Sequence, residues 1–379
     1  MNKPIRIGIL GGGQLGRMLL QSAANYHTVT YVLEKGSNPP ASSLCNYFVE
    51  GDINDYDTVY KFGKLVDALT IEIEHVNLDA LFQLEAEGLK IYPTPDALKI
   101  IKDKGLQKQF YRDNNIPTSD FRLLEKKYEL TGFLDFLPAA QKLRSGGYDG
   151  KGVEILRSDA DFAKAFDEPT VLEKLVDIEK EISVIVARND KSETTAYPPV
   201  EMVFNPKYNL VDYLVSPAQL TAEQSKQAQQ LAMQVMQALN SPGIFAVEMF
   251  LDKAGNILVN ETAPRAHNSG HQSIEGNYCS QYDMQMRVLQ NLPLGSTDAI
   301  LPSLMLNLIG EAGHSGPVKY AGLETAMQMP GVYIHLYGKH ETKPGRKMGH
   351  VTLLGNNQED LLKKAAFIKQ NLRVISGHE

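Results

Sequence analysis

The stretch RSGGYDGKG, residues 144–152, holds four glycines, two cations, one carboxylate and one aromatic ring in nine positions. Glycine loses the most backbone freedom on folding, so such a run indicates either a mobile turn or a loop whose backbone approaches a ligand. It joins two strand-like segments, PAAQKLR (138–144) and VEILR (153–157), which predicts a hairpin flap. Because Lys151 is followed by Gly152 and not by a hydroxyl residue, the stretch is not a P-loop.

The charge around this loop separates two interpretations. Lys142, Arg144 and Lys151 surround the glycines, and backbone amides together with a lysine can close over phosphates. An exposed hairpin tip that binds nothing is the alternative, but it leaves this concentration of positive charge unexplained. We therefore expect a flap that covers phosphates.

Two glutamates farther along the chain interrupt apolar strands. Glu248 lies in FAVEMFL (245–251) and Glu261 lies in LVNETAPR (258–265). A single strand glutamate is more often solvated, whereas an unpaired carboxylate that faces a protein-lined site is costly. Magnesium bound by one or two carboxylates and by substrate phosphates would compensate that cost, and Asn260 could add an oxygen. Two such glutamates after a phosphate-type loop favour a metal site.

The N-terminal segment carries a second glycine motif. IRIGIL (5–10) predicts a strand that turns into a helix at GGGQLGRMLLQSAAN (11–25), and TVTYVLE (28–34) predicts the next strand. The glycines satisfy G-x-G-x-x-G and Glu34 stands where a ribose-binding acid would, so a nicotinamide dehydrogenase is one hypothesis. The motif reports only that backbone approaches an anion at a helix N-terminus, so another phosphate ligand or a tight turn without ligand stays open.

The order of predicted elements suggests three domains of mixed α/β and α+β class. Alternating strands and helices up to YPTPDALK (92–99) predict a parallel-sheet unit over residues 1–95. A small lobe with the flap is predicted over 96–170, beginning with one helix from Pro95 to about Asn114. A strand-rich region is predicted over 171–379, with one long helix at Ala222–Leu239. Its tail, from about residue 300, is predicted to contain strands at 331–338 and 350–355 and a closing helix from Gln358 to Leu372.

Composition excludes several classes of partner. The net charge is −7 and there is no long basic run, which argues against a nucleic-acid partner. No segment reaches the roughly 18 apolar residues that a membrane span needs, and the N-terminus lacks the apolar region of a signal peptide. Cys45 and Cys279 are far apart, and HNSGH (267–271) lacks the glutamate of H-E-x-x-H, so zinc is not expected. We expect a protein of the reducing cytoplasm.

Taken together, these motifs resemble those of ATP-grasp enzymes. SGGYDGKG with NETAPRAHNSGH (260–271) and YGKHETKPGRKMGH (337–350) is similar, more narrowly, to the carboxyaminoimidazole ribonucleotide synthetase family of purine biosynthesis. The likeness runs from about Ile5 to about Leu354; Thr262 and Ala266 stand where the family usually has isoleucine and proline, and Lys104 where many members have arginine. The resemblance implies an N-terminal parallel-sheet (pre-ATP-grasp) domain, two ATP-grasp lobes and a small β-rich C-terminal extension.

The resemblance also implies an ATP site with magnesium. Lys104 and Lys142 would contact the phosphates, Glu173 and the backbone at 174–176 would meet adenine, and Glu181 would hold the ribose hydroxyls. Glu248 and Glu261 would ligate magnesium. The full set of residues implied to bind ATP is Lys104, Lys142, Gly147, Tyr148, Asp149, Gly150, Lys151, Gly152, Glu173, Lys174, Val176, Glu181 and Asn260.

For the second substrate the resemblance implies binding by Gly13, Gln14, Leu15, Glu72, Tyr148, Arg265, Lys339 and Arg346. The glycine turn would hold a ribose 5-phosphate at the helix terminus, and Lys339 and Arg346 would supply further positive charge. The implied catalytic residues are Asp149, Lys151, Arg265, His267 and Asn268. Among them, Arg265 and His267 would hold bicarbonate or carboxyphosphate, and Asp149 would steer the proton of the amine.

The reaction implied is ATP-driven carboxylation of the 5-amino group of 5-aminoimidazole ribonucleotide through carboxyphosphate, by a homodimer. A formate-dependent glycinamide ribonucleotide ligase shares the sheet, flap and metal acids, but is not expected to carry NSGH with GRKMGH. A nicotinamide oxidoreductase would leave Glu248, Glu261 and the flap unexplained. A nucleotide-binding module without catalysis is a further alternative.

Overall fold

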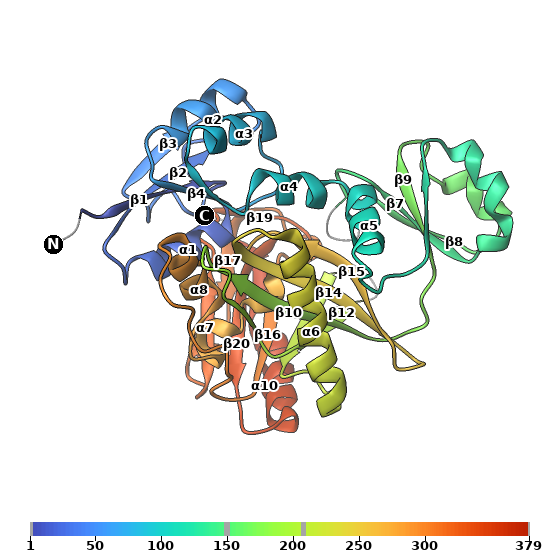
Figure 1. The fold of residues 1–379 in the computed structure, drawn as a ribbon. Helices are drawn as coiled ribbons and strands as arrows, with labels where there is room; N and C mark the ends of the chain where they lie inside the picture. Colours follow the sequence, from blue (N-terminus) through green and yellow to red (C-terminus); the bar gives the residue numbers. More distant parts are fainter. Residues whose placement is uncertain (1–2, 148–151, 206–209, 378–379) are drawn as a thin grey trace.

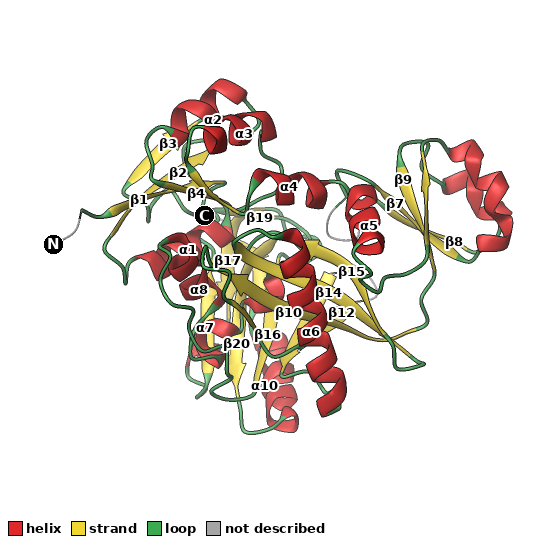
Figure 2. Cartoon of the chain, in the orientation of Figure 1, coloured by secondary structure: helices red, strands yellow, loops and turns green. Residues whose placement is uncertain are grey.

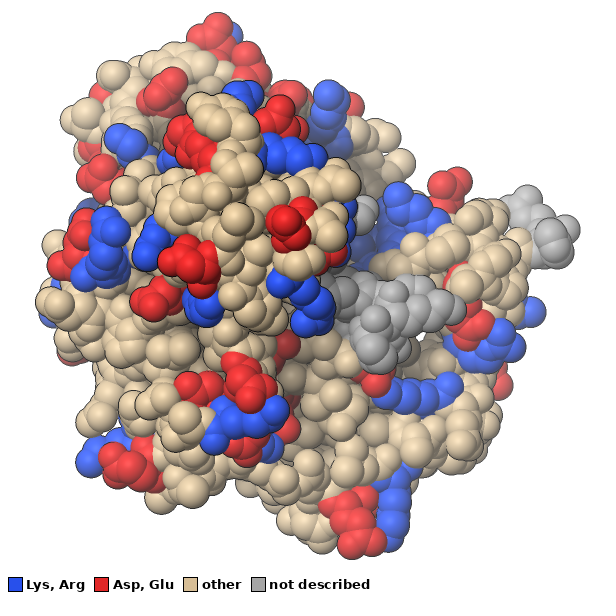
Figure 3. Space-filling view, turned by 90° about the vertical axis from the view of Figure 1, so that its right-hand side faces the viewer, with Lys and Arg blue, Asp and Glu red and all other residues tan. Residues whose placement is uncertain are grey.

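The computed structural model describes residues 3–147, 152–205 and 210–377 (Figures 1 and 2). The N-terminal unit lies above a large sheet, and a small lobe projects to the right of Figure 1. In the described part of the chain, no helix has both the length and the apolar character to cross a membrane. Figure 3 shows acidic and basic side chains interspersed over one face of the molecule, in keeping with the absence of a long basic run in the sequence.

The N-terminal unit is a parallel sheet, as predicted. Its strand order is β3-β2-β1-β4-β5, and each neighbouring pair is parallel. Parallel strands need crossover connections, and helices supply them except between β2 and β3, which residues 35–46 join without a helix. The elements are β1 (Ile5–Leu10), α1 (Gln14–Ala23), β2 (Thr28–Glu34), β3 (Tyr47–Glu50), α2 (Tyr56–Gly63), β4 (Ala68–Ile71), α3 (Leu78–Ala86) and β5 (Lys90–Tyr92).

The predicted single helix from Pro95 to Asn114 is wrong, because the chain breaks at Asp103. Helix α4 is Pro95–Lys102 and helix α5 is Lys104–Asp113. Asp103 has an extended backbone (φ −114°, ψ 111°), and its carboxylate accepts hydrogen bonds from Gly105 N at 2.7 Å and Leu106 N at 3.1 Å. This N-cap stabilises a new helix start and places Lys104 at its first position.

The small lobe is an antiparallel sheet of order β6-β9-β7-β8 with its own apolar core. The predicted flap hairpin is confirmed where it is described, since β7 and β8 pair antiparallel with Lys142 opposite Val153. Strand β9 pairs with β6 and β7, so we propose that the lobe ends near Leu175 and not at residue 170. The elements are β6 (Phe121–Leu124), η1 (Lys127–Phe136), β7 (Ala139–Leu143), β8 (Val153–Leu156), η2 (Asp159–Lys164) and β9 (Thr170–Lys174).

The large sheet runs in the order β15-β14-β10-β12-β13-β16-β20-β18, with β11 paired to β10. The long helix α6 (Ala222–Leu239) matches its predicted bounds and packs on β10 and β14. Strands β16, β20 and β18 come from the tail, so the C-terminal extension continues this sheet. The strands are β10 (Ile178–Arg188), β11 (Thr194–Ala196), β12 (Val200–Asn205), β13 (Leu210–Ser216), β14 (Gly243–Asp252), β15 (Ile257–Ala263), β16 (Ser303–Ile309), β18 (Val332–Leu336) and β20 (Lys347–Leu354).

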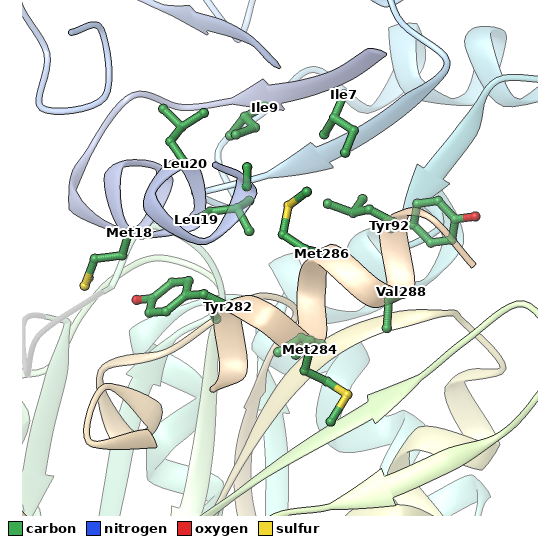
Figure 4. Close-up of a cluster of buried hydrophobic side chains, with 14 of the residues drawn as sticks. Ile7, Ile9, Met18, Leu19, Leu20, Tyr92, Tyr282, Met284, Met286 and Val288 are labelled. Atoms are coloured by element: carbon green, nitrogen blue, oxygen red, sulfur yellow. The ribbon is translucent and has the colours of Figure 1, made fainter. Parts of the chain in front are cut away.

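A helix that the sequence analysis missed joins the N-terminal unit to the large sheet. Helix α8 (Gln281–Leu289) follows η3 (Asn268–Gly270) and α7 (Ser273–Gly276), and it lies between the two layers. In Figure 4, Met286 points from α8 toward Ile9 and Leu19, while Met284 points to the opposite side. These side chains belong to one buried cluster that includes residues of β10 and β14, so both layers share a core.

The remaining elements cover the tail. Helix α10 packs its buried face, including Leu361 and Ile368, against the core beneath β16 and β20. A small antiparallel sheet of order β19-β17-β21, not predicted from the sequence, closes the C-terminus. The elements are β17 (Gly316–Ala321), α9 (Leu323–Met327), β19 (Glu341–Thr342), α10 (Gln358–Asn371) and β21 (Arg373–Ser376).

Candidate active site

The two predicted metal-binding glutamates lie opposite each other on neighbouring strands. Glu248 of β14 and Glu261 of β15 are register partners, and a bulge follows immediately after Glu248. Lys104 at the start of α5 binds the Glu261 carboxylate, and its charge lowers the pKa of Glu261. Burial and the nearby charges of Glu261 and Glu181 raise the pKa of Glu248. Ionising both glutamates together is therefore unfavourable unless a further cation binds beside them.

These residues fit magnesium. The ion commonly takes one or two protein carboxylates and keeps its other positions for water and phosphate oxygen. Within residues 3–147, 152–205 and 210–377, no three acidic, histidine or cysteine side chains form a cage for a metal. A glutamate pair with raised negative potential is the donor set expected for an ion that is shared with phosphates.

A buried ion cluster lies beside the glutamate pair. The Glu173 carboxylate is 3.0 Å from Lys142 Nζ and 2.9 Å from Lys108 Nζ, and it accepts a 2.7 Å hydrogen bond from Ser119 Oγ. Burial alone would raise the pKa of Glu173, but the charges of Lys142 and Lys108 outweigh it and lower the pKa to about 2. The carboxylate predicted to meet adenine thus forms ion pairs with two lysines in this structure.

Lys108 was not singled out from the sequence. Its side chain is 3% exposed and also donates to Thr118 Oγ1 at 2.7 Å. The available signal was its position four residues after Lys104, which puts both lysines on the same side of one helix. Burial lowers the pKa of Lys108 to about 8 against the opposing charge of Glu173.

Lys142 connects the ion cluster to the acidic strand. Its Nζ donates a 2.8 Å hydrogen bond to Asn260 Oδ1, next to Glu261. Glu181 of β10 stands nearby, and burial raises the pKa of Glu181 to about 7. The predicted phosphate lysines, the amide of Asn260 and the acids therefore occur together.

The segment predicted to meet adenine lines a cavity of about 600 Å³. Its lining includes Lys174, Leu175 and Val176, where the small lobe joins the large sheet, and Leu258 of β15. Leu258 is two residues before Asn260, so by strand alternation it faces the same way as that amide. The cavity and the cluster of lysines and acids thus lie on the same side of β15.

The loop after β15 carries the residues predicted to hold bicarbonate. Arg265 forms a 2.9 Å ion pair with Glu74, and His267 Nε2 lies 3.3 Å from Glu248 Oε1. Asn268 exchanges two side-chain hydrogen bonds with Asn307, of 2.9 and 3.1 Å. The structure therefore brings His267 to Glu248, one of the two predicted metal ligands, and Asn268 to the C-terminal strands.

The N-terminal glycine turn differs from the sequence expectation. Gly12 N donates to Glu34 Oε2 at 2.9 Å, and Leu15 N donates to Glu72 Oε1 at 3.1 Å. Burial raises the pKa of Glu72 to about 7. Two amides of the turn that was predicted to hold a phosphate, near Gly13 and Gln14, thus already bind carboxylates of the chain. The turn instead fixes Glu72, another predicted substrate residue, beside the helix start.

Cations from two parts of the chain meet at the other end of the site. Lys339 Nζ donates to Lys347 O at 2.7 Å, and burial together with the charge of Arg346 lowers the pKa of Lys339 to about 8. Arg17 of α1 lies against the turn that precedes Lys339. A Cβ atom at Gly338 would be only 3.4 Å from Arg17 Nη1. The sequence analysis missed Arg17, which directly follows Gly16 of the glycine motif.

Four predicted residues, Tyr148, Asp149, Gly150 and Lys151, lie outside the described residues. Gly147 and Gly152 flank them, and Gly152 O accepts a 2.9 Å hydrogen bond from Leu143 N.

Comparison with known proteins identifies the family. Three family models match: a ribonucleotide synthetase preATP-grasp domain over residues 4–102, an ATP-grasp domain over 109–282, and a phosphoribosylaminoimidazole carboxylase C-terminal domain over 303–364. The N5-carboxyaminoimidazole ribonucleotide synthetase structure from Thermotoga maritima is 40% identical, with a TM-score of 0.92, and the match covers 98% of this chain and 100% of that chain. This chain belongs to the N5-carboxyaminoimidazole ribonucleotide synthetase family.

Other members of the synthetase family support the assignment. The Synechococcus elongatus N5-carboxyaminoimidazole ribonucleotide synthase is 33% identical over 92% of this chain and 89% of its own length. An Aspergillus clavatus synthase solved with ADP and 5-aminoimidazole ribonucleotide is 33% identical, with a TM-score of 0.89, over 98% of this chain and 99% of that chain. The phosphoribosylaminoimidazole carboxylase of Ogataea methanolica is 35% identical over 98% of this chain, which spans 70% of that protein.

Membership in the synthetase family confirms the ATP-grasp fold and makes the chain an ATP-dependent ligase. The nicotinamide hypothesis is wrong, because the N-terminal glycine motif belongs to a preATP-grasp domain. Its Glu34, which stands where a ribose-binding acid would, accepts the hydrogen bond of Gly12.

Proposed function

We propose that this chain carboxylates the 5-amino group of 5-aminoimidazole ribonucleotide with ATP and bicarbonate, in purine biosynthesis. The observation that carries the proposal is the Glu248–Glu261 pair, which lies between the phosphate lysines and the loop of His267. The Aspergillus clavatus relative, solved with ADP and 5-aminoimidazole ribonucleotide, supports this choice of substrates.

The nucleotide half of the site uses the cavity and the ion cluster. Adenine would lie in the cavity beside Lys174–Val176, and the phosphates would meet Lys104 and Lys142. Glu248 and Glu261 would hold magnesium, which neutralises phosphate charge when bound. Because Glu173 and Lys108 fix the Lys142 ammonium before ATP arrives, the phosphates meet a preorganised positive site.

The second substrate would lie between the N-terminal unit and the C-terminal strands. Its ribose phosphate would be bound by Lys339, Arg346 and Arg17, whose positions suit an anion better than the occupied glycine turn. Glu72 would accept hydrogen bonds from the ribose. Arg265 and His267 would hold bicarbonate near Glu248.

The chemistry requires activation because bicarbonate is a poor electrophile. A bicarbonate oxygen attacks the γ-phosphorus, the bond to ADP breaks, and carboxyphosphate forms. Its breakdown to carbon dioxide and phosphate supplies the carbon that bonds to the amine nitrogen, which loses one proton. The protein's part in such a transfer is positioning and charge neutralisation, so no covalent nucleophile is needed.

The setting of the enzyme is a further part of the proposal. We propose that the enzyme is cytoplasmic, because the free cysteines Cys45 and Cys279 suit a reducing compartment. We also propose that it is a homodimer, as the family resemblance implies. Sedimentation of the full chain tests the dimer; a monomer at micromolar concentration would contradict it.

The decisive experiment measures ADP release with magnesium-ATP and bicarbonate, with and without 5-aminoimidazole ribonucleotide. We expect strong stimulation by this nucleotide and none by glycinamide ribonucleotide with formate. Stimulation by the glycinamide pair alone would move the chain to that sister activity. Silence with both pairs would overturn the proposal.

A further inference from the structure

Three polar side chains form a line across neighbouring strands of the C-terminal extension. In the register of β16, β20 and β18, Asn307 lies opposite His350, and His350 lies opposite His335. Register partners point to the same face of a sheet, so the three side chains are neighbours. The rings of His335 and His350 are stacked, with centroids 4.4 Å apart and an interplanar angle of 8°.

A second line of polar side chains from the catalytic loop lies against the first. Asn268, His271 and Glu275 are three and four residues apart in the segment that forms η3 and α7, and Figure 1 shows α7 beside β20. Each meets one member of the strand line. Asn268 exchanges hydrogen bonds with Asn307, the His271 ring lies 4.8 Å from the His350 ring, and Glu275 Oε1 is 2.7 Å from His335 Nε2. We call these six residues the polar row.

One glutamine sets the chemistry of the middle contact. Gln281 Oε1 accepts from His267 N at 2.9 Å and its Nε2 donates to His267 O at 2.8 Å, so the amide orientation is fixed. The same Nε2 lies 3.2 Å from His271 Nδ1, which must therefore accept. Neutral His271 accordingly carries its proton on Nε2, and the backbone of His267 is tied to the polar row.

The polar row connects the two halves of the substrate site. At one end, Asn268 follows His267, which reaches Glu248. On the strand side, His350 Nδ1 is 3.1 Å from the hydroxyl of Tyr337, a buried residue two positions before Lys339. The Lys339 ammonium itself lies 5.6 Å from the Tyr337 ring centre. The chain of contacts thus runs from the carboxylation loop to the phosphate cations.

We infer that the polar row is a positioning device. It fixes the position of the loop that carries Arg265 and His267 relative to Lys339 and Arg346. This inference rests on the proposed function, in which one end binds bicarbonate and the other binds the ribose phosphate. His350 and His335 act through the residues they contact and are positioning residues. Loss of this relative position separates the activated carbon from the amine and leaves the proposed ATP cavity unchanged.

A purely structural core would give a different result from a positioning device. Removing a structural residue lowers stability and affects both substrates alike. A displacement of about 1 Å between reacting groups instead costs on the order of 100-fold in rate while distant binding contacts persist. The buried ion cluster around Glu173, which we propose contacts ATP, lies apart from the polar row. Separate kinetics for the two substrates can therefore distinguish a positioning role from a structural one.

The test compares His350→Leu with Thr352→Val in the full-length chain. Thr352 is two residues farther along the same strand, fully buried, and its hydroxyl has no hydrogen-bond partner among the described residues. We measure KM for each substrate, kcat, the ratio of ADP released to carboxylated product, and the melting temperature. For His350→Leu we expect kcat/KM for 5-aminoimidazole ribonucleotide to fall by about 10- to 100-fold, with more ADP per product and an unchanged KM for ATP.

His350→Asn keeps a polar atom near the Nδ1 position and should recover part of the coupling, while Thr352→Val should match the wild type. If His350→Leu does not fold, Glu275→Gln is the second variant. It replaces the carboxylate that contacts His335 by an amide of the same size and should raise the ratio of ADP released to carboxylated product. Wild-type coupling in a folded His350→Leu, or equal losses for both substrates, would overturn the inference. A wild-type chain without nucleotide-stimulated ADP release would instead refute the proposed function.

Discussion

Glu248 and Glu261 face each other across β14 and β15, yet their partners differ: Lys104 binds Glu261, and His267 meets Glu248. Lys104 is placed by the N-cap of α5 and His267 by the loop after β15. In the proposed function, the glutamate pair thus stands where the nucleotide half of the site meets the carboxylation half.

Replacing Glu248 by Gln should lower kcat for ADP release by about 100-fold or more, because preorganised electrostatic stabilisation of this kind is worth roughly 3 kcal/mol. Raising the magnesium concentration should recover part of the rate. Glu201→Gln is the matched control, since Glu201 pairs with Lys180 on the same sheet at 2.8 Å. An unchanged magnesium dependence in Glu248→Gln would contradict the metal assignment.

Lys108→Met should destabilise the protein by about 3 kcal/mol, because it leaves part of a buried ion cluster unpaired. It should also raise KM for ATP, since the Glu173 carboxylate then pulls Lys142 alone. Urea unfolding of Lys108→Met, Glu173→Gln and the double variant measures the coupling. A double variant whose loss equals the sum of the single losses would show that Lys108 and Glu173 are independent.

Arg346→Met should raise KM for 5-aminoimidazole ribonucleotide by about tenfold or more, because a charge-assisted contact to phosphate is worth roughly 1.5–3 kcal/mol. KM for ATP should not change. Lys343→Met serves as control, since Lys343 is an exposed cation of the same turn. Equal effects of both variants would mean that only the overall charge of this turn matters.

The buried histidines should make stability depend on pH. Burial, with the neighbouring cations and histidines, lowers the pKa of His271 and of His350 well below the ordinary value. The groups near His271 include Arg265, His267 and Lys347, and His335 with its partner Glu275 lies beside His350. Both rings are neutral in the fold and take up protons on unfolding, so their contribution is complete above the unfolded-state pKa and is lost as pH falls below it.

Each such histidine should therefore cost about 1.4 kcal/mol per pH unit below roughly pH 6.5, the ordinary pKa of histidine. Urea unfolding between pH 8 and pH 5 measures the slope. His350→Asn should remove the part due to His350. An identical slope in this variant and the wild type would show that His350 does not titrate on unfolding.

Local sequence patterns predicted most of the elements because strand alternation, helix periodicity and glycine turns are local properties. The α4–α5 break was missed since it depends on Asp103, whose capping carboxylate also binds Arg144, directly after β7, at 2.7 Å. Helix α8 was missed because its Met-rich faces pack on both sides, which leaves little polar periodicity. The glutamate pair was found because a charge in an apolar strand is visible in sequence.

The contacts that decide how the site is oriented were beyond local patterns. Glu173 reads as an adenine ligand in its motif, but lysines from α5 and β7 converge on it in space. The same holds for the glycine turn, whose amides are taken by Glu34 and Glu72 from two other strand ends. The polar row needs the register of three strands, which no single segment encodes.

The position of α8 has a mechanical consequence. A helix whose Met286 and Met284 are buried in opposite layers fastens the N-terminal unit to the large sheet, so these two bodies should move as one. The small lobe has a separate core and meets the large sheet at the cavity that we propose for adenine. Nucleotide would thus enter at a hinge, whereas the imidazole substrate would dock against an immobile wall, and motion during turnover should be confined to the side where phosphate is transferred.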